Sequence, residues 1–270
     1  MAKRKEYSEL TFIDDFMFCK IMVKYPELCK ELLELILDVK IREIKFPEAQ
    51  KVLEETYDGR GIRLDVYIED DNNTVYDLEM QTTKKRDLPK RTRYYQGMID
   101  IHLIGRNAKF RELKKSYVIF ICTSDPFGKK LPVYTFENRC RQDNEIVLGD
   151  DAYKVIINAD GNRDGLSEEM SDFLDFLQGK ENDGKLSGKL EQAVSEAIQD
   201  GIWKEEYEMT WTMKLNEERE DAAIEATIET ALEFNASEEG IIQKLMSKFQ
   251  LSEAEAKDRF EEYQNSLQLV

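Results

Sequence analysis

The chain has 270 residues, of which 41% are hydrophobic and 35% charged, with 5 Pro and 13 Gly. This composition excludes a disordered, collagen-like or low-complexity protein and allows one large domain or a core domain with an appendage. The formal net charge of −17 argues against a protein that coats nucleic acid or an acidic membrane. The single histidine, His102, excludes any site that needs two histidines. Chemistry therefore has to come from carboxylates, amides, Lys, Arg and Tyr.

The cysteines and the apolar segments indicate where the protein resides. No Cys-x-x-Cys pair occurs, so the four cysteines are expected to be buried thiols of a reducing cytosol rather than disulfides or metal ligands. No stretch approaches the 18 uninterrupted apolar residues of a membrane span, and no apolar segment follows the basic N-terminus. We expect a soluble, cytoplasmic protein without membrane contact. The cysteines are Cys19, Cys29, Cys122 and Cys140.

The first part of the chain mixes helical and strand patterns. Apolar spacing predicts a helix over residues 13–25 and a second one from Pro26, which suits a first-turn position. Alternating residues 62–69 and the segment 74–81 flank a cluster of turn formers and predict a β-hairpin. Helical spacing returns over residues 84–106. Further strands are expected at 117–122, which is continuously apolar, and at 132–138 and 152–158.

After Asn158 the sequence becomes helical and acidic. A helix is expected near residues 167–177, and long helices from about 190 to 234. Asn235 with Glu238, and Ser252 with Glu255, fit capping boxes that start two short amphipathic helices. The sequence therefore predicts a first domain over 1–180, a Gly/Asn/Asp-rich linker over 181–189 and an acidic helical region over 190–270.

The charge is unevenly distributed along the chain. Residues 1–150 sum to zero, so residues 151–270 carry the whole −17. Within the first part, residues 84–130 contain 13 basic residues and four acids, a local net charge of +9. This basic segment is either a solvated face that compensates acidic neighbours or a surface for an anionic partner.

Two carboxylates and an amide stand on the predicted hairpin. Asp65 lies on its first strand, and Glu79 and Gln81 share one face of its second strand because side chains alternate. The turn length brings Asp65 opposite the Glu79 end. Acids flanked by apolar residues are costly unless they are paired or bind a cation, and Mg²⁺ accepts one or two carboxylates together with substrate phosphate oxygens. A polar, solvated hairpin face is the simpler alternative.

Several motifs in one order resemble a known family. These are Asp14-Asp15-Phe16-Met17-Phe18, Arg63-Leu64-Asp65-Val66, the 13-residue spacing to Glu79-Met80-Gln81, and Arg91-Thr92-Arg93-Tyr94-Tyr95-Gln96. Over about residues 7–125 the sequence resembles the Rpn-type recombination-promoting nucleases, also called PD-(D/E)XK nuclease family transposases. The resemblance implies a restriction-endonuclease-like α/β core, with a central mixed sheet flanked by helices, and metal-dependent DNA cleavage. An all-α C-terminal region would follow this core.

The resemblance also assigns roles to individual residues. Asp65 takes the place of the metal-binding Asp, and Glu79 that of the second acid. Gln81 stands where many nucleases of the wider superfamily carry Lys, so the metal has to supply more of the charge stabilisation. Asp15 is the candidate for a third metal ligand from an upstream helix, although Asp14 and Asp15 are equally suited to helix capping. The implied cofactor is Mg²⁺ or Mn²⁺.

The basic segment gains a role beside these acids. A helix that follows Gln81 directly would start near the metal, and its basic side chains would hold the phosphates that flank the cut. Arg91 and Tyr95 share a helix face, whereas Arg93 points elsewhere. His102, on the same helix, is expected to be packed. The DNA-binding residues implied are Lys84, Lys85, Arg91, Arg93 and Tyr95.

The sequence thus favours a Mg²⁺-dependent DNA endonuclease, a phosphodiester hydrolase linked to recombination or mobile elements, with catalytic residues Asp65, Glu79 and Gln81. The alternative is a catalytically idle nuclease-like scaffold that acts through protein partners by its acidic helical tail. The last helices, residues 236–270, have a net charge of −3, which favours a partner, homo-oligomer or autoregulatory surface over DNA binding. Trp203, Tyr207 and Trp211 recur at helical spacing and are expected to pack.

Overall fold

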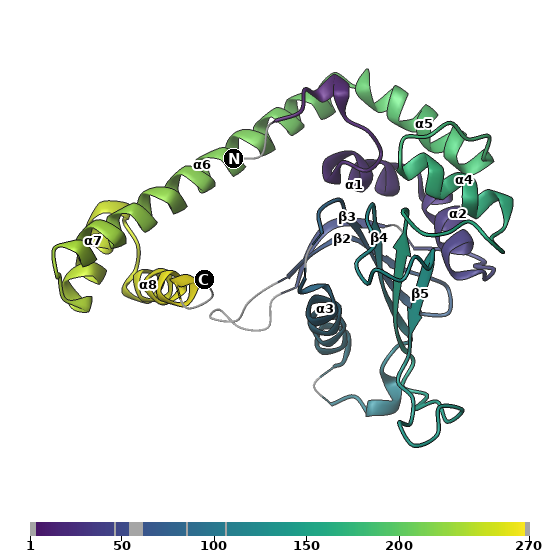
Figure 1. Ribbon diagram of the computed structural model, residues 1–270, viewed down its shortest axis with the longest axis horizontal. Helices are drawn as coiled ribbons and strands as arrows, with labels where there is room; N and C mark the ends of the chain where they lie inside the picture. Colours follow the sequence, from purple (N-terminus) through teal and green to yellow (C-terminus); the bar gives the residue numbers. More distant parts are fainter. Residues whose placement is uncertain (1–3, 46, 54–61, 85, 106, 268–270) are drawn as a thin grey trace. The chain divides into compact units, whose positions relative to one another are not determined.

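The computed structural model describes residues 4–45, 47–53, 62–84, 86–105 and 107–267 (Figure 1). Its centre is a six-stranded sheet in the order β1-β2-β3-β4-β6-β5. The strands are β1 (Glu48–Leu53), β2 (Ile62–Glu69), β3 (Val75–Gln81), β4 (Ser116–Cys122), β5 (Val133–Phe136) and β6 (Ala152–Asn158).

Strand direction determines which residues meet at one edge of the sheet. β1, β2 and β3 pair antiparallel, β3, β4 and β6 run parallel, and β5 pairs antiparallel with β6. The carboxyl ends of the three parallel strands, at Gln81, Cys122 and Asn158, therefore lie at the same edge. The start of β2 lies at that edge too, because β2 opposes β3. We call this the carboxyl edge of the sheet.

Helices cover both faces of the sheet (Figure 1). One face carries α3 (Leu88–Leu103), whose Met98 and Ile99 pack with Phe120 of β4 in a buried cluster. Ile119 and Ile121 alternate with Phe120 and are fully buried on the opposite face. Figure 1 shows that the opposite face carries α1 (Asp15–Lys24), α2 (Pro26–Leu37), α4 (Glu168–Leu177) and α5 (Lys185–Ile198), while short 3₁₀ turns lie at Tyr7–Glu9 and Phe110–Glu112.

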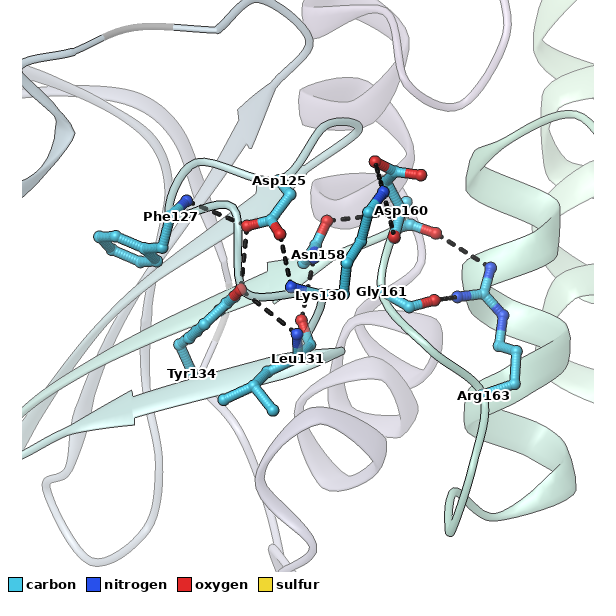
Figure 2. Close-up of polar contacts among 10 residues, drawn as sticks. Asp125, Phe127, Lys130, Leu131, Tyr134, Asn158, Asp160, Gly161 and Arg163 are labelled. Carbon is cyan, nitrogen blue, oxygen red and sulfur yellow. Dashed lines mark hydrogen bonds and ion pairs between the residues drawn. The ribbon is translucent and has the colours of Figure 1, made fainter.

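A hydrogen-bonded loop fixes the carboxyl edge beside β3 (Figure 2). After β4, Asp125 accepts hydrogen bonds from the Phe127 and Lys130 N–H groups, at 3.0 and 2.7 Å, and from the Tyr134 hydroxyl at 2.9 Å. Burial raises the pKa of Asp125, but these donors outweigh burial and hold it below its usual value. The Thr123 N–H binds the Gln81 carbonyl at 3.1 Å, so this loop braces the end of β3.

The same loop is tied to the end of β6, as Figure 2 also shows. Fully buried Asn158 donates to the Leu131 carbonyl at 2.9 Å and accepts from the Asp160 N–H at 3.1 Å. Arg163 donates to the Gly161 carbonyl at 2.6 Å. The loops after β4 and β6 therefore form one network at the carboxyl edge.

The chain divides into two compact units, residues 1–201 and 202–270. The division lies beyond the predicted linker 181–189, because α5 packs against α1, α2 and α4 and so belongs to the first unit. The second unit contains α6 (Gly201–Glu233), α7 (Glu238–Phe249) and α8 (Glu253–Leu267). Ile228, Leu245 and Phe260, one from each helix, meet in its apolar core.

Most predicted elements are present, with corrections at their ends. β1 was not predicted. The helix expected from residue 84 begins at Leu88, and His102 on it is exposed rather than packed. Ser237, not Asn235, caps α7, because its side chain accepts from the Gly240 N–H. The capping box of Ser252 and Glu255 is confirmed by bonds of 2.7 to 3.3 Å.

The aromatic residues of α6 were expected to pack, and they do so to different degrees. Tyr207 is buried, while Trp203 and Trp211 are half-buried. Cys19, Cys29 and Cys122 are buried free thiols, as expected, and Cys140 is half-buried. Within the described ranges, no helix combines the length and apolar character that a membrane crossing requires.

Candidate functional site

Asp65 and Glu79 are held together where β2 and β3 separate. The paired register of the two strands runs from Val66 with Leu78 to the turn, and Asp65 lies one residue beyond it. At that point the Asp65 N–H donates to Glu79 Oε1 at 2.9 Å, and the Met80 N–H donates to Asp65 Oδ2 at 3.0 Å. Each carboxylate thus accepts a hydrogen bond from a main-chain N–H of the neighbouring strand, in place of a main-chain carbonyl. These bonds fix both side chains in position.

Helix α1 adds an acid and a thiol to this site. Ligand atoms of Asp15, Cys19 and Asp65 all lie within 4.8 Å of one another. Cys19 Sγ is 3.7 Å from Asp15 Oδ1 and 3.4 Å from the Asp65 carbonyl oxygen. Asp14, by contrast, accepts hydrogen bonds from Thr11 and Lys5. Asp15 is therefore the acid of this pair that reaches the site.

The carboxylates lie close together and are largely shielded from solvent. Burial, and then the charge of Asp15, raise the pKa of Asp65 to about 7. Burial and the charges of Asp77 and Asp65 raise the pKa of Glu79 well above its usual value. Asp77, two residues before Glu79 on the same strand face, is completely buried, and burial raises its pKa as well. Negative charge is thus in excess in this region.

Asp77 is the acid in this region whose carboxylate is least compensated by neighbouring groups. Neither of its carboxylate oxygens has a donor among the described residues. Its contact with Glu79 becomes a hydrogen bond only when one of the two acids carries a proton. A buried acid without a donor is costly, and a nearby cation would relieve that cost.

These residues fit a hard divalent cation. Asp65 and Glu79 supply carboxylate oxygens from adjacent strands, and Asp15 supplies one from α1; such oxygen ligands suit Mg²⁺ and Mn²⁺. The sequence predicts Cys19 to be a packed thiol and no metal ligand, but its sulfur lies among the candidate ligand atoms. Burial and the Asp65 charge raise the pKa of this thiol far above its usual value, so it is a neutral S–H group beside the acids.

Gln81 and Arg91 form the second half of the site. Arg91 Nη1 donates to Gln81 Oε1 at 2.8 Å, and Nη2 donates to the Tyr95 hydroxyl at 3.1 Å. Nη2 also lies 3.7 Å from Glu79 Oε2. Gln81 Nε2 donates to the Thr83 carbonyl at 2.7 Å. A cation from α3 therefore stands beside the acid pair.

A cavity of about 730 Å³ joins both halves. Most of the predicted site residues line it, as do Arg63, Lys90 and Tyr94. Lys84 is exposed and precedes α3 without lining the cavity, and Lys85 lies outside the described residues. The predicted residues at the cavity wall are Asp15, Asp65, Glu79, Gln81, Arg91, Arg93 and Tyr95.

Sequence reasoning missed Cys19 and Asp77. The four-residue spacing of Asp15 and Cys19 places them on one helix face, and the two-residue spacing of Asp77 and Glu79 places them on one strand face. Both signals were present. The first conflicts with the expectation that the cysteines are core residues, and the second requires Asp77 to share the strand face of Glu79 and Gln81.

An α/β core with acids on two adjacent strands, a helix acid and a cation-lined cavity defines a nuclease-like domain. Residues 13–145 match the family model described as PD-(D/E)XK nuclease family transposase, so this part of the chain is similar to that family. The match contains every candidate ligand named above. Comparisons with curated proteins and with solved structures give no significant match.

Proposed function

We propose that the protein is a DNA endonuclease that requires Mg²⁺ or Mn²⁺ and acts on recombination or mobile-element DNA. The observation that carries the proposal is the reciprocal bonding of half-buried Asp65 and buried Glu79, whose carboxylates line a cavity that Arg and Lys side chains also line. The matched family, whose description names both nuclease and transposase, agrees with it.

Asp65 and Glu79 are the proposed metal ligands, with Asp15 as a third. When bound, the divalent cation lowers the pKa of a water molecule and offsets charge on the phosphate. Hydrolysis forms a bond from the water oxygen to phosphorus and breaks the bond to one bridging oxygen, which leaves with the electron pair and is then protonated from water. The protein's own residues hold the metal ligands in place, restrict the directions from which water can approach the phosphorus, and supply positive charge beside the phosphate.

DNA would be held through its backbone by side chains around the cavity. Arg93 is exposed at the cavity wall, and Tyr95 is half-buried beside it. Lys84, exposed in the segment between β3 and α3, and Lys85 extend the positive charge along the chain. Such contacts position a duplex without selecting a base sequence. Binding should therefore weaken steeply as salt is raised.

The proposal is tested by nicking of a supercoiled plasmid with Mg²⁺ or Mn²⁺. Wild type is expected to nick only with the metal, and Asp65→Asn is expected to lose the activity. Asp71→Asn, an exposed change in the β2–β3 turn, is the matched control and should cut like wild type. Equal nicking by Asp65→Asn and wild type would refute the site. Absence of nicking together with absence of Mn²⁺ binding would favour the idle-scaffold alternative.

A further inference from the structure

The position of Arg91 carries an inference that rests on the proposed function and deepens it. A phosphodiester in the cavity gains negative charge as it is attacked, and residue 81 is an uncharged glutamine. We infer that Arg91 is the catalytic side-chain cation at the scissile phosphate, and that Gln81 is the residue that positions it.

The orientation of the Gln81 amide is determined by its partners. Its Nε2 group donates to the Thr83 carbonyl at 2.7 Å and lies 3.0 Å from Thr83 Oγ1. A carbonyl only accepts, so the amide nitrogen has to face Thr83 and the amide oxygen has to face Arg91. That oxygen accepts from Arg91 Nη1 at 2.8 Å. Gln81 therefore presents an acceptor, and no charge, to the guanidinium group.

The guanidinium group is restrained on its remaining sides. Tyr95, one helical turn along α3, accepts from Nη2 at 3.1 Å. The guanidinium carbon lies 5.1 Å from the centre of the Phe120 ring and 5.4 Å from that of Tyr95. A planar cation placed in this way keeps its position without substrate, which is what preorganised charge stabilisation requires.

Arg91 also keeps donors available for a phosphate. A guanidinium group carries five N–H donors, and the hydrogen bonds to Gln81 and Tyr95 use two of them. The 3.7 Å separation from Glu79 Oε2 is an ion pair and too long for a hydrogen bond. The side chain is 23% exposed and lines the cavity beside Glu79, so a phosphate in the cavity has open access to Arg91.

The pairing explains why a glutamine is suitable at position 81. A lysine there would bring an ammonium group against the Arg91 guanidinium and would offer no acceptor to Nη1. Replacing Gln81 by Lys should therefore be tolerated only when Arg91 is replaced by Gln at the same time. Arg93 is a poor substitute, because it lies two residues further along α3 and is exposed.

The test compares Arg91→Gln with Arg93→Gln, which removes the same charge from the same helix. For Arg91→Gln, single-turnover cleavage should fall about 10²–10³-fold while DNA affinity changes less than tenfold. Its affinity for Mn²⁺ should rise, because a cation beside Glu79 is removed. Arg93→Gln should weaken DNA binding and reduce the salt dependence of that binding, so its cleavage should fall in proportion to the fraction of DNA bound, with Mn²⁺ affinity unchanged.

The exchange of partners supplies the decisive comparison. Gln81→Lys alone should lose activity, and Gln81→Lys combined with Arg91→Gln should cut at least tenfold faster than Arg91→Gln alone. Thermal unfolding confirms that each variant is folded, and Arg91→Lys shows how much the charge alone restores. If wild type cleaves DNA and Arg91→Gln cleaves it at a rate within threefold of wild type, this inference is overturned and the proposed nuclease activity stands. A wild type that cuts no DNA with either metal would overturn both.

Discussion

Asp65 and Glu79 bind each other's strands: Glu79 Oε1 accepts from the Asp65 N–H, and Asp65 Oδ2 accepts from the Met80 N–H. Each acid thus uses one carboxylate oxygen in a hydrogen bond to the neighbouring strand and leaves the other oxygen outside that bond. The hydrogen bond and the charge are separable by substitution, because an amide retains one acceptor oxygen but lacks the charge.

Asp65→Asn is therefore expected to fold like wild type and to bind Mn²⁺ at least tenfold more weakly. Its remaining side-chain oxygen can still accept from the Met80 N–H, so its melting temperature should lie within a few degrees of that of wild type. Calorimetric titration and thermal unfolding measure the two quantities. Asp71→Asn serves as the exposed control. Unchanged Mn²⁺ affinity would show that Asp65 is not a ligand.

Metal binding should depend on pH through Asp65. Burial and the charge of Asp15 raise the pKa of Asp65 to about 7, well above its usual range. Below pH 7 the cation has to displace a proton, so Mn²⁺ affinity should fall by up to about tenfold per pH unit towards pH 6 and level off towards pH 8. Titrations at pH 6, 7 and 8 test this. In Asp65→Asn the Asp65 contribution to this slope is absent, and an identical slope would contradict the assignment.

The same raised pKa affects the stability of the metal-free protein. The folded chain keeps a proton on Asp65 that the unfolded chain releases, so folding is favoured at low pH. The free energy of unfolding should fall as pH rises from about 4 through about 7. Saturating Mn²⁺ should reverse the fall, since it binds the ionised acid. Denaturant unfolding with and without metal measures both effects.

The sequence predicts those parts of the fold and the site whose contacts join residues close together in the chain. The β2–β3 hairpin and the Asp65–Glu79 pair follow from local alternation and turn length. β1 did not, because Glu48 and Lys51 disfavour strands and only pairing with β2 makes them one. The contact of Arg91 with Gln81 was also out of reach, since it requires α3 to pack on Phe120 of β4, a strand distant in sequence.

Asp14 and Asp15 are alike in sequence and should differ in effect. Asp15 lines the cavity, whereas Asp14 accepts from the Thr11 N–H at 2.8 Å and from Lys5 at 2.7 Å. Asp15→Asn is expected to weaken Mn²⁺ binding several-fold. Asp14→Asn should instead lose the ion pair with Lys5 and cost about 0.2–1 kcal/mol of stability at unchanged Mn²⁺ affinity. Titration and unfolding of both variants decide, and equal Mn²⁺ affinities in the two would remove Asp15 from the site.

Asp77 should be a source of instability without metal. It is completely buried, burial raises its pKa, and no described residue donates to its oxygens. Asp77→Asn removes the ionisation and should stabilise the metal-free protein by about 1–3 kcal/mol at pH 8. Because acid already neutralises the wild-type side chain, the gain should shrink towards pH 5. A gain of equal size at both values of pH would show that charge is not its cause.

Gly161 should be required for the carboxyl edge. A Cβ at this position would lie 2.5 Å from the Pro132 Cα, which is backbone and has little room to move. Pro132 itself is held there, since its carbonyl accepts from the Asn158 N–H at 2.8 Å. Gly161→Ala should therefore force the loops after β4 and β6 apart and cost about 1–3 kcal/mol.

Gly97 provides the matched control for this prediction. It lies within α3, and a Cβ there would meet nothing within 4 Å. Gly97→Ala should stabilise the protein by about 0.5–1 kcal/mol, because alanine favours helix more strongly than glycine. Urea unfolding of both variants measures the two effects. If Gly161→Ala unfolds at the same urea concentration as wild type, the tight contact between Gly161 and Pro132 does not hold these loops together.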